Sequence, residues 1–219
     1  MTGPVELWDA VTGERRPAAA RTQNGRTLVA LDLARAESAF VVFRPDALPP
    51  AAPAKRCAPV ALEGPWTLAF PSGWGAPASV EVAALRPLND LPELDDEAKA
   101  FSGTVSYRRS FASDGKPVTL DLGDVASVAE VFVNGRKVRT LWAPPYRCDL
   151  SGFTRPGANE LRVDVTDTWF NRLAYDAKLP EPSRKTWTIA GPKAGTQLRP
   201  SGLLGPVRIR ALSNGTTAP

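Results

Sequence analysis

Histidine is absent from this 219-residue sequence, and its absence excludes several kinds of active site. Ser-His-Asp and Cys-His nucleophile systems and histidine-ligated metal centres all depend on an imidazole ring. Cysteine is nearly as scarce. Cys57 and Cys148 stand far apart in the chain, so the CxxC pair of a cysteine zinc site does not occur. The two thiols are compatible with free core cysteines or with one disulfide, and the sequence leaves that choice open.

Long apolar runs and basic runs are also missing. No apolar run approaches the ~20 residues that a membrane-spanning helix requires. The first ten residues, MTGPVELWDA, lack the charged and apolar regions of a signal peptide. The formal net charge is +4, but no Lys/Arg run exceeds two residues. Nucleic-acid binding needs a clustered basic stripe. We therefore expect neither nucleic acid nor a membrane as a partner.

The abundant residues are those that form turns. Proline occurs 22 times and glycine 17 times, and such turn-rich chains are usually all-β or disordered. Apolar residues alternate with polar ones in many short segments, which indicates antiparallel strands with one buried face. The segments expected to form strands are 5–9, 27–33, 38–44, 103–111, 118–122, 128–133, 136–141, 161–166 and 207–210.

Two Asn-Gly pairs, at 24–25 and 134–135, stand where hairpins are expected. Asn and Gly tolerate the positive φ that a tight type I′ turn demands. No stretch has a sustained helical period, and residues 95–100 are expected to form at most one short turn. The strand patterns therefore predict an all-β protein.

The strands and the proline distribution predict four parts. Residues 1–45 are expected to be the terminal strands of an upstream, incomplete β-sandwich, or an extra layer packed on the larger domain, because so few strands rarely form a core alone. Residues 46–57 are typical of a Pro/Ala linker, since proline removes backbone donors and stiffens the chain. Residues 58–213 are expected to form a jelly-roll β-sandwich, and 214–219 a tail.

Several of these segments resemble parts of known glycoside hydrolases. The strand at 107–111 (Tyr-Arg-Arg-Ser-Phe), the Asn-Gly hairpin at 131–135 and the strands at 145–150 and 156–163 are similar to the sugar-binding-type, galactose-binding-like sandwich of family 2 glycoside hydrolases. The C-terminal region of family 106 α-L-rhamnosidase-like proteins is a closer match. Its matching segments are 125–131, 141–147, 169–173 and 200–207, and residues 4–45 look like the strands that precede this region in those enzymes.

This resemblance implies a galactose-binding-like jelly roll that serves as a non-catalytic carbohydrate-binding or structural module of a rhamnosidase-like glycoside hydrolase. The expected partners are a carbohydrate or a catalytic glycosidase domain. The catalytic barrel of that family has no counterpart in these residues, so we expect no activity of the chain alone. A free-standing lectin-like protein and a small active glycoside hydrolase are the alternatives. The resemblance suggests an extracytoplasmic location.

The aromatic residues supply the candidate site. Sugar rings stack on exposed indoles while neighbouring Arg and Asn side chains bind hydroxyls. Trp66 is expected in the core, beside Leu68 and Phe70. The stretch 169–206 has little strand signal, and a loop of that length is usually functional or docked on a neighbour. Packing in the core or between domains is the alternative explanation for these tryptophans. The candidate carbohydrate-binding or interdomain residues are Trp142, Tyr146, Arg147, Trp169, Asn171, Arg172 and Trp187.

The acidic residues suggest no convincing active site. Glycoside hydrolysis generally needs two carboxylates about 5–10 Å apart. We expect the carboxylates to lie on solvated strand faces and in turns, with no catalytic residue and no cofactor. The run 89–97 could ligate calcium, but it lacks regular spacing, and acids at a helix start explain it equally well. The acids considered are Glu63, Glu81, Glu130, Glu160, Asp90, Glu93, Asp95, Asp96 and Glu97.

Overall fold

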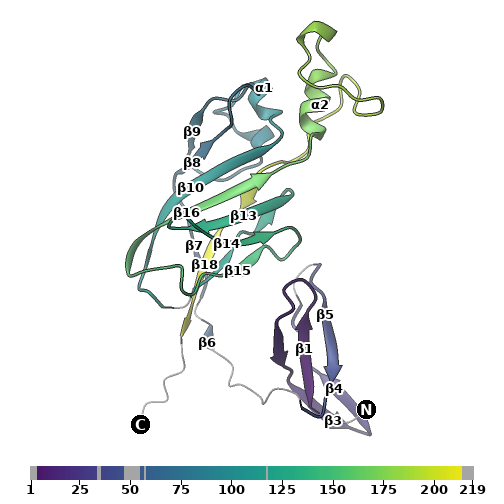
Figure 1. Ribbon diagram of the computed structural model, residues 1–219, viewed down its shortest axis with the longest axis vertical. Coiled ribbons are helices and arrows are strands. Elements are labelled where there is room, and N and C mark those ends of the chain that lie inside the picture. The colour runs from purple at the N-terminus through teal and green to yellow at the C-terminus, as the bar shows by residue number, and fades with distance from the viewer. Residues whose placement is uncertain (1–3, 34–35, 47–54, 57, 117, 214–219) are drawn as a thin grey trace. The chain divides into compact units, whose positions relative to one another are not determined.

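The structure of the chain is a computed structural model that forms two compact units, Met1–Lys55 and Arg56–Pro219 (Figure 1). The expected linker, with Cys57, and the expected tail lie largely outside the described residues. No helix among the residues described is long and apolar enough to cross a membrane. The structure describes residues 4–33, 36–46, 55–56, 58–116 and 118–213.

The first unit consists of short antiparallel strands. β1 is the central strand of a three-stranded sheet with the order β2-β1-β5, and β3 pairs with β4. Asn24 and Gly25 join β3 to β4 with φ values of 50° and 71°, which confirms the predicted type I′ turn. The strands are β1 (Val5–Asp9), β2 (Arg15–Pro17), β3 (Ala20–Gln23), β4 (Arg26–Val29) and β5 (Ala39–Phe43).

The second unit contains a six-stranded antiparallel sheet with the order β14-β13-β16-β10-β8-β9. Its longest pairing joins β10 to β16, from Thr104 opposite Thr166 to Ser113 opposite Gly157. The strands are β8 (Trp66–Ala69), β9 (Ser79–Val82), β10 (Thr104–Ser113), β13 (Val128–Val133), β14 (Arg136–Leu141) and β16 (Gly157–Thr166). Asn134 and Gly135 turn β13 into β14 with φ values of 51° and 78°, as predicted.

A second sheet of this unit has the order β15-β11-β18-β6, with β7 also paired to β18. β12 and β17 form a separate two-stranded ladder. The strands are β6 (Lys55–Arg56), β7 (Val60–Ala61), β11 (Val118–Asp121), β12 (Asp124–Val125), β15 (Arg147–Asp149), β17 (Leu203–Gly205) and β18 (Arg208–Ser213).

Both large sheets contribute side chains to one hydrophobic core. Trp66, Leu68, Tyr107 and Val163 come from the six-stranded sheet and Leu120 from the other, and all five are almost completely buried. They occupy alternate strand positions, because successive side chains of a strand point to opposite faces. The predicted all-β sandwich is confirmed, as is the predicted core position of Trp66.

The helices correct one expectation. The short turn expected at 95–100 is present as α1 (Asp96–Lys99), but the stretch 169–206, which was expected to be a long loop, contains a second helix. α2 (Phe170–Asp176) follows directly after β16, and the 3-10 turns η1 (Leu88–Asp90) and η2 (Glu181–Ser183) also occur. α2 has only seven residues, too few for a helical period to be recognised in the sequence.

Candidate functional site

The first group of predicted site residues lies between β14 and β15. Trp142 is 62% exposed, so its indole is open to a partner. Arg147 is also exposed, and its Nε donates to the Asp121 carboxylate at 2.8 Å. Tyr146 is buried, and its hydroxyl donates to the Ser127 carbonyl at 2.9 Å. Tyr146 is therefore unsuited to direct contact with a ligand or a neighbouring domain, because its ring packs in the core.

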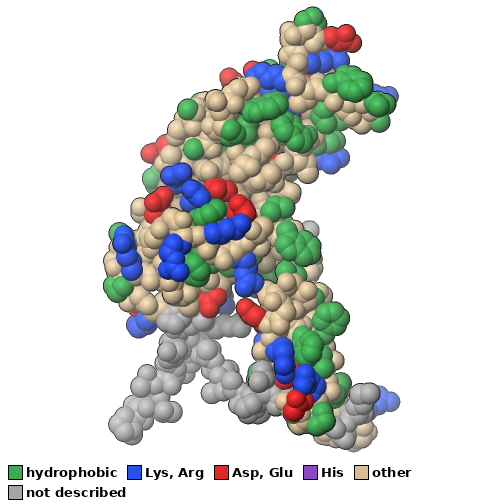
Figure 2. All heavy atoms as spheres, viewed as in Figure 1, with side chains coloured by type: hydrophobic (Ala, Val, Ile, Leu, Met, Phe, Trp, Pro, Cys, Tyr) green, Lys and Arg blue, Asp and Glu red, His purple; other side chains and the backbone are tan. Residues whose placement is uncertain are grey.

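The second group lies on residues 169–202, which we call the α2 arm. The arm leaves the end of β16, and Figure 1 shows it extending beyond the sandwich sheets of the second unit. Trp169 is 45% exposed and Trp187 is 77% exposed. The Trp169 ring also packs on Trp74, with 4.9 Å between ring centroids. In Figure 2, apolar, basic and acidic side chains are interspersed on this part of the surface.

Arg172 stabilises the arm through buried hydrogen bonds. Its side chain is 1% exposed, and its guanidinium donates to Glu97 at 2.9 Å and to Asp176 at 2.7 Å. It also donates to the backbone carbonyl of Trp74 at 3.3 Å. A buried charge is tolerated only when it is paired and hydrogen-bonded. Arg172 is therefore a structural residue, and its predicted role as a surface contact is not supported.

Asp176 extends this network into the loop that follows α2. Its Oδ2 accepts hydrogen bonds from the backbone N–H groups of Lys185 and Thr186, at 3.1 and 2.7 Å, and from the Thr186 hydroxyl at 2.6 Å. Burial opposes ionisation of Asp176, but the hydrogen bonds from Arg172 and Thr186 outweigh it and lower the pKa of the carboxyl. The exposed Trp187 therefore follows an anchored segment of the loop.

Asn171 anchors the end of the arm. Its Nδ2 donates to the Arg199 carbonyl at 2.8 Å, and its Oδ1 accepts from the Arg199 N–H at 2.9 Å. Asn171 is buried, so this side chain too is unavailable to a ligand. Of the seven predicted residues, Trp142, Arg147, Trp169 and Trp187 are accessible. The other three hold the structure together.

A small pocket at the base of the arm was not predicted from the sequence. It has a volume of about 180 Å³, and we call it the Asp167 pocket. Asp167 follows β16, and its Oδ2 accepts from the Gly202 N–H at 2.7 Å. Burial raises the pKa of the Asp167 carboxyl to about 6. The lining residues are Ala126, Ser127, Asp167, Thr168, Phe170, Asn171, Arg199, Pro200 and Ser201.

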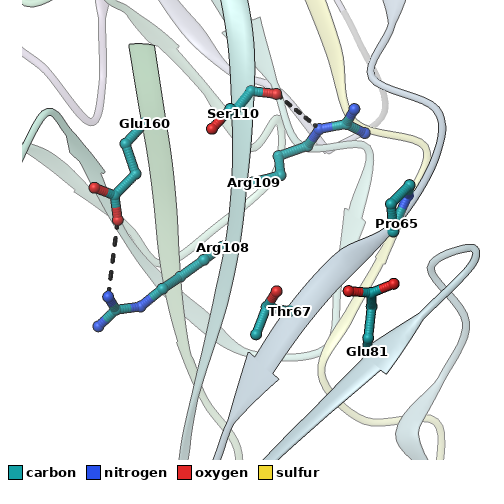
Figure 3. Close-up of a pocket in the computed structure, with 7 residues that line it drawn as sticks. All are labelled: Pro65, Thr67, Glu81, Arg108, Arg109, Ser110 and Glu160. Carbon is teal, nitrogen blue, oxygen red and sulfur yellow. Dashed lines mark hydrogen bonds and ion pairs between the residues drawn. The ribbon is translucent and has the colours of Figure 1, made fainter. Parts of the chain in front are cut away.

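An open groove of about 450 Å³ lies on the six-stranded sheet (Figure 3). Glu160 lies 3.8 Å from Arg108, and Glu81 reaches the groove from β9. Glu130 lies on β13 and pairs with Lys137, which holds the pKa of the Glu130 carboxyl below its usual range. A general acid needs the opposite shift. Glu130 is therefore not suited to the role of the general acid.

The acidic run 89–97 has structural roles in this fold. The Asp95 carboxylate caps α1 by accepting from the Ala98 N–H at 2.8 Å. Glu97 pairs with Arg172 and with Lys185, and hydrogen bonds from Lys185 and Arg172 lower the pKa of its carboxyl. Among the described residues, no group of three or more Asp, Glu or Cys side chains could hold a metal ion.

Known proteins similar to this chain are glycoside hydrolases. The structure of a rhamnosidase from Novosphingobium sp. PP1Y matches 96% of the chain with 40% sequence identity and a TM-score of 0.80. The resemblance predicted from the sequence is confirmed. A protein named "Putative beta-glucuronidase", from Formosa agariphila, is 35% identical over 185 residues, which is 70% of this chain.

The chain corresponds to a small part of each relative. It spans 21% of the Novosphingobium rhamnosidase and 16% of the Formosa protein. A beta-glucuronidase from an uncultured Clostridium species shares the fold, with a TM-score of 0.54 and 21% identity over 76% of this chain and 31% of its own. No protein-family model matches the sequence.

Proposed function

We propose that this chain is a non-catalytic accessory β-sandwich module of a rhamnosidase-like glycoside hydrolase, with the galactose-binding-like jelly-roll fold. One observation carries the proposal. The similarity to the rhamnosidase extends over 96% of this chain but over only 21% of the enzyme. The described carboxylates support the same conclusion, because Glu130 and Glu160 are in ion pairs on an exposed strand face. Function resides in sites rather than in folds, so similarity to part of an enzyme does not by itself make this chain catalytic.

The exposed aromatic residues give the module a contact surface. Trp142, Trp169 and Trp187 present indole rings to solvent, and Ile189 is 90% exposed. Three of these four side chains, those of Trp169, Trp187 and Ile189, belong to the α2 arm, and exposed apolar patches mark protein–protein or ligand contacts. The Arg172–Asp176 pair holds the arm in one conformation, so a partner binding there loses little ordering entropy. The catalytic part of the glycosidase is the partner that we propose for this surface.

The test places this chain in an enzyme. The matching fifth of the Novosphingobium rhamnosidase is replaced by this chain, and rhamnosidase turnover and thermal unfolding are measured. We expect turnover to be retained and the chimera to unfold in one transition. Trp187→Ser with Ile189→Ser should lower the unfolding temperature of the chimera, whereas the matched control Val60→Ser, at an exposed β7 position, should not.

Two results would contradict the proposal. One is a folded chimera without turnover in which this chain unfolds in a separate transition. The other is an unfolding temperature of the chimera that Trp187→Ser with Ile189→Ser leaves unchanged, since these exposed side chains would then contact no other part of the enzyme.

A second candidate function is carbohydrate binding by the module itself. Arg184 and Lys185 precede Trp187 in the sequence, and an indole near hydrogen-bonding cations is a common arrangement for sugars. In this lectin-like alternative, the isolated chain binds glycans without any partner domain. Affinity that is lost in Trp187→Ser would favour this alternative over interdomain packing.

A further inference from the structure

The Asp167 pocket contains polar groups that the fold leaves without partners. The Ser201 hydroxyl is buried and has no hydrogen-bond partner among the described residues. Asp167 uses Oδ2 for the Gly202 N–H, and Oδ1 has no partner in the described part of the chain. A buried polar group without a partner costs free energy, so such groups commonly mark a site that a water or a ligand completes.

The pocket lining also includes a cation stacked on an aromatic ring. The guanidinium of Arg199 lies 3.5 Å from the centroid of the Phe170 ring, and it makes no ion pair with any described residue. Ser127 and Thr168 add hydroxyl groups at the pocket lining. The pocket therefore combines one carboxylate, one guanidinium, three hydroxyls and an aromatic side chain within about 180 Å³.

We propose that the Asp167 pocket binds one ring of a neutral, polyhydroxylated ligand, that is, a single sugar residue at the end of a glycan. This inference rests on the carbohydrate-related role proposed above and gives that role a site distinct from the exposed tryptophans. A sugar hydroxyl donates to the free Asp167 oxygen, while ring and hydroxyl oxygens accept from Arg199 and from the hydroxyls of Ser127 and Thr168, which are more accessible than Ser201.

Charge and size favour a neutral sugar over other ligands. An anion would face the Asp167 carboxylate, and a cation would face the Arg199 guanidinium. A neutral polyol satisfies both groups, because each of its hydroxyls is both donor and acceptor. Pockets for drug-sized ligands measure about 300–1,000 Å³. The smaller pocket here, about 180 Å³, suits a single ring rather than an oligosaccharide.

The pocket is also fixed before a ligand arrives. Asp167 is tied to Gly202, and the backbone of Arg199 is held on both sides by the buried Asn171 amide. These hydrogen bonds join the segment that follows β16 to the C-terminal end of the arm. Asp167 and Gly202 are 35 residues apart in the sequence. A site whose walls are already ordered loses less entropy on binding. Asn171 and Gly202 are thus positioning residues, and Asp167 and Arg199 are the contacts.

The experiment uses the whole chain and a panel of monosaccharides: L-rhamnose, D-galactose and D-glucuronate. Binding is followed by saturation-transfer NMR and by titration of backbone amide shifts. We expect at least one neutral sugar to shift the amides of residues 167–171 and 199–202. Asp167→Asn should lower the affinity for that sugar at least about tenfold, since hydrogen bonds to charged groups are stronger than those between neutral groups. Asp149→Asn, at an exposed carboxylate on β15, is the matched control and should change the affinity less than about twofold.

Further variants keep the test decisive if Asp167→Asn does not fold. Thr168→Ala and Ser127→Ala remove hydroxyls at the pocket lining, and each should weaken binding by about threefold. The proposal is overturned if no sugar of the panel shifts the pocket amides. It is equally overturned if a sugar binds to the pocket variants with unchanged affinity but no longer binds to Trp187→Ser. That second result would place the sugar on the arm and would be compatible with the accessory role. Glycoside cleavage by the chain, in contrast, would contradict the accessory role itself.

Discussion

Arg172 and Asp176 form an ion pair of 2.7 Å between side chains that are 1% and 2% exposed, one turn apart on α2. Removing one partner of such a pair leaves an uncompensated buried charge, which typically costs about 3–5 kcal/mol. Arg172→Ala should therefore lower the free energy of unfolding by about that amount in urea denaturation. The control is Arg147→Ala, which breaks the exposed pair with Asp121 and should cost about 1 kcal/mol or less. Equal losses in the two variants would contradict the structural role of Arg172.

The β13–β14 turn predicts a backbone effect. Gly135 has φ = 78°, and a Cβ built there meets no atom within 4 Å, so a side chain is resisted by conformation and not by packing. Gly135→Val should lower stability by about 1 kcal/mol or more. Gly135→Asn is the matched control, because Asn tolerates the left-handed region, and it should cost less. Melting temperatures of the three proteins check this, and an unchanged value for the valine variant would disprove it.

Asp167 predicts a pH dependence of stability. Burial raises the pKa of its carboxyl from 3.8 to about 6 in the folded chain. The folded state therefore holds this proton more tightly than the unfolded state. Its contribution to stability is complete below pH 4 and is lost as the pH rises through 6. Asp167→Asn keeps an acceptor for Gly202 and removes the titration, so its stability relative to wild type should increase from pH 4 to pH 7.5.

The size of this increase has an upper limit. At 1.36 kcal/mol per pKa unit, the shift from 3.8 to about 6 corresponds to at most about 3 kcal/mol. Urea titrations of both proteins at pH 4 and pH 7.5 measure it. A difference in unfolding free energy that stays constant with pH would show that the Asp167 carboxyl is not desolvated.

Cys148 predicts a protected thiol. It is a free cysteine in the core, and burial raises the pKa of its thiol to about 12. Thiolate is the reactive form, so the folded thiol should be nearly inert. In a Cys57→Ser background, Ellman's reagent should label Cys148 only after denaturation. Rapid labelling of the native chain would mean that this part of the core opens.

Local sequence signals were sufficient for much of the fold. The Asn134-Gly135 turn follows from the chemistry of two residues. The alternation at 103–111 and 161–166 predicts most of β10 and the second half of β16, although their pairing extends to Ser113 opposite Gly157. The side chain of Asn134 adds a role that the turn motif does not show. Its Nδ2 donates to Asn159 at 2.9 Å and its Oδ1 accepts from the Glu160 N–H at 3.1 Å, which ties the hairpin to β16.

The candidate site was less predictable because its determinants are far apart in the sequence. Arg172 is predicted as a contact residue, yet its side chain is buried. Its hydrogen-bond partners there are Glu97, 75 residues away in the sequence, and the carbonyl of Trp74, 98 residues away. Tyr146 is also buried, and its hydroxyl is satisfied there by a hydrogen bond to the Ser127 carbonyl. The Asp167 pocket gives no local signal either, since the partner of Asp167 is a backbone N–H on the returning end of the arm.

The most direct test of the accessory role is hydrolysis by the isolated chain. The purified protein is incubated with aryl α-L-rhamnosides and aryl β-D-glucuronides beside Glu130→Gln, a variant of a carboxylate already paired with Lys137. Both proteins are expected to show no release of the aryl group above the uncatalysed rate. Turnover by the wild-type chain that disappears in Glu130→Gln would contradict the account, because it would make an exposed, paired carboxylate a catalytic residue.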